Sequence, residues 1–152
     1  MGTEIKRYRY LLAIFSIIYI SLLSSCNDKN EESERSLTIR RLTGNSIKYW
    51  GLEQSFIDEV SQPISSCDSS YLLTLKADFS WEEAYQRLSC YRLTKGSWAL
   101  NDENNVLSIN YISQFSGKEE EKKFEVIELS EDFFTYQFAR NNQLIRNRLK
   151  KN

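Results

Sequence analysis

The side chains in this chain that could do chemistry are three cysteines and two groups of neighbouring acidic residues. The sequence has no histidine, which removes Ser-His-Asp and Cys-His catalysis and the commonest protein ligand of transition metals. It also contains no CxxC pair, no glycine-rich phosphate loop and no dinucleotide fingerprint. No nucleophile can be paired with a base, so we expect no enzyme and assign no catalytic, metal-binding or cofactor-binding residue.

The acidic groups do not change that expectation. Glu82 and Glu83 are adjacent, and adjacent strand residues point to opposite faces, so the pair cannot serve one reaction centre. Glu119, Glu120 and Glu121 lie in the charged stretch 117–123, which we interpret as a solvated hairpin tip. Calcium at residues 102–104 would need six or more oxygen ligands, and this turn is too short to supply them.

Two of the cysteines, Cys67 and Cys90, form an even pair once the third, Cys26, is set aside. In an exported protein such a pair indicates a disulfide, which would close a loop of roughly two dozen residues and contribute about 3 kcal/mol. Two alternatives stay open at this stage. One is a reactive thiol, although nothing nearby would lower its pKa, and the other is two separate buried thiols.

The first 26 residues have the order of a bacterial export signal. A basic start with Lys6, Arg7 and Arg9 precedes the apolar stretch 11–23, which is shorter than the roughly 20 residues that span a bilayer. Small residues then lead to Cys26, and this arrangement resembles the bacterial lipobox. The resemblance implies a lipid-modified Cys26 as the first residue of the mature chain, anchored by several acyl chains. An uncleaved signal anchor is the alternative.

Residues 27–36 are polar and charged and are typical of a flexible tether. We therefore divide the chain into a signal peptide at 1–25, a lipidated cysteine with its tether at 26–36, and a domain at 37–152. The expected location is the bacterial outer membrane. Acidic residues soon after Cys26 resemble a surface-export signal, but a solvated linker has the same composition, so the periplasmic and cell-surface faces both stay open.

From about residue 43 the apolar residues mostly follow period two, which indicates strands separated by short turns. The expected strands cover residues 46–53, 70–77, 81–93, 97–101, 107–111, 122–129, 133–138 and 144–149. Eight short strands at this spacing, with turns between them, predict an all-β meander that closes as a sandwich or a barrel.

One segment departs from this pattern. Phe56, Ile57, Val60 and Ile64 have roughly helical spacing and Pro63 is a helix breaker, so we expect one short helix near residues 54–62. If the Phe56, Ile57 and Val60 side chains were exposed, they would form a contact surface for another envelope protein.

The second half of the chain contains Gly96-Ser97-Trp98, then an Asn/Asp turn and a strand, and then the stretch Phe124–Ser130 before an aromatic strand. This order resembles the small lipocalin-like domains of Bacteroidetes lipoproteins. Cysteines flanking the strand near residue 73 also occur in that family. Ser46 stands where a tryptophan is common there. Over about residues 37–150 the resemblance implies an eight-stranded antiparallel up-and-down (lipocalin-like) barrel or a flattened barrel, and it implies no particular ligand.

An eight-stranded barrel is either filled by its own side chains or holds one small ligand. The expected inward side chains are bulky, which favours a filled core; they are Trp81, Tyr85, Trp98, Tyr111, Phe124, Tyr136 and Phe138. Inward tyrosines favour the second outcome, because each hydroxyl needs a partner. In that case Trp81, Tyr85, Trp98, Tyr111 and Tyr136 would contact a small apolar or amphipathic ligand.

Charge restricts the partners further. A formal net charge of −1 argues against nucleic acid. Arg146, Arg148 and Lys150 would share one face of the last strand, which could meet an anionic partner or protect an edge strand from aggregation. The expected function is therefore a lipid-anchored binding domain, and the alternative is a filled β-domain that presents a surface to an envelope protein.

Overall fold

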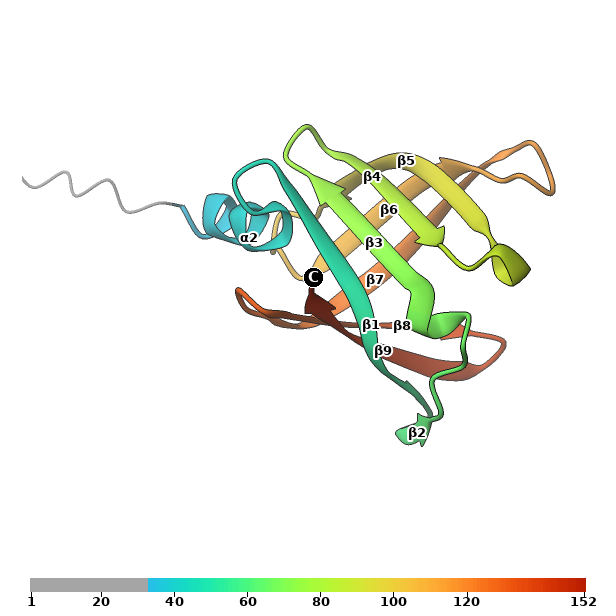
Figure 1. The fold of residues 1–152 in the computed structure, drawn as a ribbon. Helices are drawn as coiled ribbons and strands as arrows, with labels where there is room; N and C mark the ends of the chain where they lie inside the picture. Colours follow the sequence, from blue (N-terminus) through green and yellow to red (C-terminus); the bar gives the residue numbers. More distant parts are fainter. Residues whose placement is uncertain (1–32) are drawn as a thin grey trace, which may run out of the picture. The chain divides into compact units, whose positions relative to one another are not determined.

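Eight antiparallel strands close into a barrel in the computed structural model, which describes residues 33–152 (Figure 1). The strands are β1 (Ile47–Ile57), β3 (Tyr71–Lys76), β4 (Ser80–Tyr85), β5 (Arg92–Leu100), β6 (Val106–Ile112), β7 (Glu119–Leu129), β8 (Phe133–Arg140) and β9 (Gln143–Lys151). A ninth strand, β2 (Val60–Gln62), extends β1 as a short hairpin, and each consecutive barrel pair is antiparallel. This confirms the expected eight-stranded up-and-down barrel.

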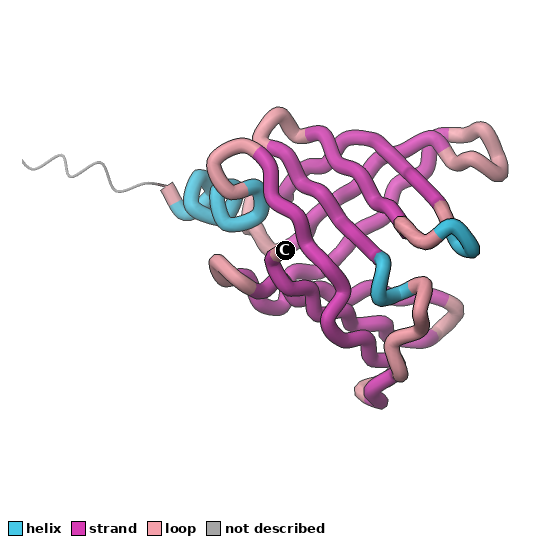
Figure 2. Tube along the Cα trace, in the orientation of Figure 1, coloured by secondary structure: helices cyan, strands magenta, loops and turns pink. Residues whose placement is uncertain are grey.

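Strand β1 closes the barrel because it has two barrel neighbours. Its first half, Ile47–Gly51, pairs with β3, and its stretch Trp50–Ile57 pairs with β9. A β-bulge between Leu52 and Gln54 shifts the register against β9, and such bulges bend a strand. The ring of strands is therefore continuous, and Figure 2 shows these strands in magenta.

One end of the barrel is covered by helix α2 (Glu34–Thr43) (Figure 1). Its N-cap is Ser33, whose hydroxyl accepts from the Ser36 amide, and the chain leaves it through Gly44 at a φ of 64°. Leu42 is fully buried, and its carbonyl accepts from the Trp50 indole at 2.9 Å. No helix in residues 33–152 is long and apolar enough to cross a membrane.

A buried lysine fastens the C-terminal end of α2 to the barrel. Lys48 is 4% exposed, donates to the Arg41 carbonyl at 2.7 Å, and lies 4.3 Å from the centre of the Trp50 ring. The position matches the negative end of the helix dipole. Burial lowers the pKa of Lys48 from its ordinary value, and the contact with Glu131 partly opposes this shift.

The apolar core fills the helix-covered half of the barrel. The largest side chains with almost no exposure are Trp50, Trp81, Phe134, Leu42, Leu73, Leu75, Leu107, Ile109 and Leu149. Trp98 is also buried and donates its indole N–H to the Lys76 carbonyl at 3.0 Å. The unit Ser33–Asn152 thus contains a closed sheet and its own core, which are the requirements for folding alone.

The expected helix near residues 54–62 is wrong. Residues 54–57 continue β1, and a tight turn at Asp58-Glu59 leads into β2. Both turn residues have positive φ, 47° and 67°, which suits the right-handed twist of a two-residue hairpin. Hairpin pairing therefore overrides the helical spacing of Phe56, Ile57 and Val60.

Other boundaries also differ. The folded unit begins at Ser33, so the last residues of the expected tether, 34–36, are the first turn of α2. The expected strand 81–93 divides into β4, a 3-10 turn η2 (Leu88–Cys90) and the start of β5. A second such turn, η1 (Asp68–Ser70), precedes β3. Glu119–Lys123 belong to strand β7 and not to the hairpin tip.

Gly96 lies inside β5, although it falls between the expected strands 81–93 and 97–101, and its missing side chain is a packing requirement. A Cβ at this position would lie 1.9 Å from the Asn110 carbonyl oxygen and 2.8 Å from the Trp81 indole nitrogen. The Trp81 indole crosses this point and donates to the same carbonyl at 3.3 Å. Only glycine lets β5, β6 and the Trp81 ring approach this closely.

Replacing Gly96 with alanine should therefore lower the free energy of unfolding by about 1–3 kcal/mol, the usual cost of overpacking. Urea denaturation followed by tryptophan fluorescence measures this. Ser97→Ala, at the exposed neighbouring position, is the matched control and should change stability by less than about 0.5 kcal/mol. Equal effects of the two substitutions would contradict the steric argument.

Candidate functional site

The half of the barrel away from α2 is hollow. A cavity of about 630 Å³ occupies it, within the range of small-molecule sites, so the expectation of a filled core is wrong for this half. Every barrel strand contributes to its wall. The lining residues are Leu52, Ser55, Ile57, Gln62, Pro63, Ile64, Asp68, Tyr71, Glu83, Tyr85, Arg92, Tyr111, Phe115, Lys122, Phe124, Tyr136, Phe138, Arg140, Ile145 and Asn147.

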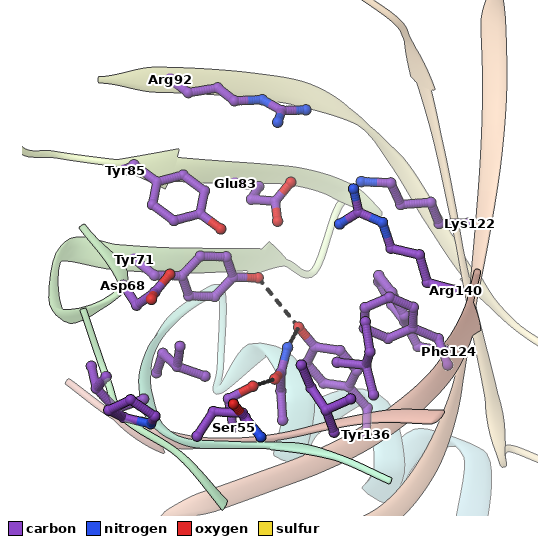
Figure 3. A pocket seen from close by; sticks show the side chains of 18 of the residues that line it. Ser55, Asp68, Tyr71, Glu83, Tyr85, Arg92, Lys122, Phe124, Tyr136 and Arg140 are labelled. Atoms are coloured by element: carbon purple, nitrogen blue, oxygen red, sulfur yellow. Dashed lines mark hydrogen bonds between the residues drawn. The ribbon is translucent and has the colours of Figure 1, made fainter. Parts of the chain in front are cut away.

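A chain of hydrogen bonds links four of the lining residues (Figure 3). The Ser55 hydroxyl donates to Asn147 Oδ1 at 2.8 Å, and Asn147 Nδ2 donates to the Tyr136 hydroxyl at 3.1 Å. The Tyr136 and Tyr71 hydroxyls lie 3.5 Å apart. The β1 bulge sets this arrangement, because the register shift after Leu52 pairs Ser55 with Asn147.

The two tyrosines in this series of hydrogen bonds, Tyr71 and Tyr136, have hydroxyl pKa values above the ordinary value. Burial raises the pKa of Tyr136 to about 12, although its hydrogen bonds with Tyr71 and Asn147 oppose the shift. Burial and the neighbouring Tyr136 raise the pKa of Tyr71 well above its usual value. At neutral pH the two hydroxyls are therefore neutral groups that can donate and accept hydrogen bonds, not bases.

Charged side chains occupy the cavity wall nearer its mouth. Arg92, Lys122 and Arg140 come from β5, β7 and β8, and Figure 3 shows Lys122 and Arg140 side by side and Arg92 on the strand beyond Tyr85 and Glu83. The two lining carboxylates, Glu83 and Asp68, come from β4 and η1. The site is thus amphipathic, because aromatic and aliphatic side chains and five charged side chains line the same cavity.

Tyr111 connects the wall to the hairpin between β6 and β7. Its hydroxyl donates to Glu120 Oε2 at 2.7 Å, and Ser116 donates to the other carboxylate oxygen at 3.1 Å. Burial and the bond to Glu120 raise the pKa of Tyr111 to about 12, while the bond from Tyr111 lowers the pKa of Glu120. Glu120 therefore holds the hairpin against the barrel.

The disulfide between Cys67 and Cys90 is confirmed, and it joins two segments at the mouth. Cys67 directly precedes η1, and Cys90 ends η2, so the bond links the chain on either side of the β3–β4 hairpin. It closes a separation of 23 residues. Asp68, which lines the cavity, is adjacent to this cross-link.

Three of the five aromatic residues that we expected to contact a ligand line the cavity: Tyr85, Tyr111 and Tyr136. Trp81 and Trp98 do not line it, since both are 2% exposed and lie in the core with their indole N–H groups bonded to backbone carbonyls. Phe124 and Phe138, expected to point inward, also line the cavity.

Sequence reasoning did not assign the charged wall or the hydrogen-bonded chain. A signal existed, because inward residues alternate along a strand. The expected inward Phe124 implies an inward Lys122, and in the same way Phe138 implies Arg140 and Tyr85 implies Glu83. Ser55 carried no such signal, because the bulge before it reverses the alternation.

Two basic residues of β9, Arg146 and Arg148, have structural roles. Strand β9 pairs with both β8 and β1, so the interpretation of an edge strand is wrong. Arg146 forms a bidentate pair with Glu59, and Arg148 lies 3.3 Å from Glu53. These contacts brace the outer face of the hairpin and the bulge of β1.

The proposed contact surface of Phe56, Ile57 and Val60 does not exist as one patch. Ile57 lines the cavity, whereas Val60 is exposed on β2. The Phe56 ring lies on the outer face of the barrel, with its centre 4.9 Å from Arg146 Cζ. Among residues 33–152, no group of three or more acidic, histidine or cysteine side chains could hold a metal ion.

The closed eight-stranded meander, capped at one end and hollow at the other, defines a lipocalin-like barrel. A crystal structure of a lipocalin-like protein from Bacteroides uniformis ATCC 8492 is similar, with a TM-score of 0.54 and 15% sequence identity. The match covers 74% of this chain and 99% of that chain. No protein-family model matches the chain, and no curated protein matches it.

The shifted tyrosines predict a loss of stability in strong base. A folded-state pKa near 12, against about 10 when unfolded, gives stability that is fully present below pH 10 and lost as the pH rises toward 12. Denaturation curves across this window should show the loss. Tyr136→Phe should flatten the pH dependence, and an unchanged slope in that variant would contradict the assignment.

Proposed function

We propose that this protein is a lipid-anchored lipoprotein of the bacterial outer membrane whose lipocalin-like domain binds a small apolar or amphipathic molecule. The observation that carries the proposal is the cavity of about 630 Å³. Natural barrels of eight strands that are not filled by side chains hold a single small ligand. The binding role needs no cofactor and no catalytic group.

The lining suits such a ligand. Phe124, Phe138, Leu52 and Ile145 provide apolar surface on several sides, and the tyrosine hydroxyls and Asn147 provide fixed hydrogen-bonding groups. A mostly apolar wall with a few polar groups is the usual composition of a small-molecule site. The closed end beneath this wall is rigid because it is packed with large buried side chains.

The anchor rests on the sequence alone, since Cys26 lies outside the described residues. Its support is the order of basic start, apolar stretch and small residues before the cysteine. The disulfide agrees with folding in an oxidising compartment, because such bonds persist outside the cytoplasm.

A second candidate is a docking role toward an envelope protein. Several apolar side chains near the mouth are largely exposed, including Leu88 at 98%, Phe115 at 90% and Ile112 at 70%. Exposed apolar groups of this kind mark interaction surfaces when they form a patch. This candidate predicts no saturable uptake of a small molecule, which separates it from the first.

Residues 27–152, exported to form the disulfide, should bind the uncharged dye N-phenyl-1-naphthylamine saturably and one to one, followed by dye fluorescence. Ile57→Trp fills part of the cavity and should weaken binding at least about tenfold. Phe56→Trp, on the outer face of the same strand, is the matched control and should change affinity less than twofold. Binding that is absent, or equal in all three proteins, would contradict the proposal.

Lipidation has a separate test. Cells that express the full chain and are fed an alkyne-tagged fatty acid should label the protein, and Cys26→Ser should abolish the label. Cys67→Ser, which removes a different cysteine, should retain it. Label that persists in Cys26→Ser would contradict anchoring at this residue.

A further inference from the structure

The three cations that line the cavity differ in their partners from five cations on the outer face of the barrel. Among those five, Lys76 and Lys95 contact Glu82, and Lys123 contacts Glu121. The same holds for Arg146 with Glu59 and for Arg148 with Glu53.

In contrast, Arg92, Lys122 and Arg140 have no carboxylate oxygen within 4.0 Å among the residues that the structure describes. The Lys122 Nζ atom lies 4.9 Å from the centre of the Tyr111 ring, and the Arg92 Cζ atom lies 5.9 Å from the centre of the Phe115 ring. Two of the three cations thus lie near aromatic rings, which do not neutralise their charge.

The three cations act on one region of the site. They project from the wall formed by β5, β7 and β8, and Figure 3 shows Lys122 and Arg140 side by side across from Glu83. Burial, and then the Glu83 and Asp68 carboxylates, raise the pKa of Tyr85, while Arg92 and Arg140 oppose this shift, so both guanidinium groups lie near the Tyr85 hydroxyl.

The two lining carboxylates do not balance this charge. The Asp68 carboxylate already accepts from the Ser65 hydroxyl at 2.6 Å and from the Ser65 amide at 3.2 Å. Glu83 has no hydrogen bond or ion pair within residues 33–152 and faces the cations across the cavity (Figure 3). Three cations against two carboxylates leave the wall with an excess of positive charge.

We propose that the ligand is an organic anion: an apolar or aromatic body carrying one acid group, such as a carboxylate, sulfonate or phosphate. This deepens the proposed function and rests on it. The acid group binds Arg92, Lys122 and Arg140 near the mouth. The body lies deeper, against Phe124 and Phe138. Charge-assisted bonds to guanidinium and ammonium groups supply specificity over a neutral molecule of the same shape.

Two dyes of matched shape test this in residues 27–152, the part that contains the whole folded unit. 1-Anilinonaphthalene-8-sulfonate carries one sulfonate, and N-phenyl-1-naphthylamine is its uncharged parent. The sulfonated dye should bind about tenfold more tightly, and its affinity should fall as ionic strength rises. The neutral dye should show little dependence on salt.

Variants locate the effect. The triple variant Arg92→Gln, Lys122→Gln and Arg140→Gln should weaken the sulfonated dye at least about tenfold and change the neutral dye less than twofold. Lys123→Gln, the outward neighbour on β7, is the matched control and should change neither dye. Glu83→Gln removes a repelling charge and should tighten the sulfonated dye a few fold, a gain that a merely damaged fold would not produce.

The outcomes distinguish failure of the proposed function from failure of the anionic-ligand proposal alone. If neither dye binds, the proposed function and this inference both fail. If the neutral dye binds and the sulfonated dye binds no better, the cavity is a binding site but the anionic ligand is overturned. Equal losses for both dyes in the triple variant, or a loss in Lys123→Gln as large as in that variant, would also overturn it.

Discussion

Closure of the sheet by β1 is the constraint on which the rest of the structure depends. Because β1 pairs with β3 along its first half and with β9 along its second, the barrel has no free edge in the ring. The bulge after Leu52 allows this change of partner, and Glu53 in the bulge is held by Arg148. The same bulge turns Ser55 inward, so one irregularity both closes the barrel and completes the hydrogen-bonded chain beside the cavity.

The two halves of the barrel differ because their inward side chains differ in size and polarity. Three tryptophans and a row of leucines fill the end under α2, whereas tyrosines, shorter polar residues and charged side chains line the other end. Polar groups facing an enclosed space need partners, and Tyr136, Asn147 and Ser55 supply them to one another. The remaining charges face the open end, where solvent or a ligand can meet them.

Much of this fold follows from the alternation of apolar residues, and the failures have local causes. Helix α2 escaped prediction because its sequence is mostly polar and only Leu42 and Thr43 are buried, although Ser33, the basic last turn and Gly44 are ordinary helix signals. The hairpin at Asp58-Glu59 lacks the usual Asn-Gly signal. The cavity could not be predicted, because whether inward aromatics fill a barrel depends on where along the strands the tryptophans lie.

Because the mouth of the cavity is cross-linked by the disulfide between Cys67 and Cys90, its structure depends on the redox state of the compartment in which the chain folds. It ties the segment that carries Pro63, Ile64 and Asp68 to the approach to β5, where strand pairing alone does not hold it. In protein made in a reducing cytosol, the barrel strands and the packed core would be unchanged, but the segment at the mouth would lack its disulfide cross-link. Affinities measured on such material would describe a different opening, so formation of the disulfide is part of the chemistry that builds the site.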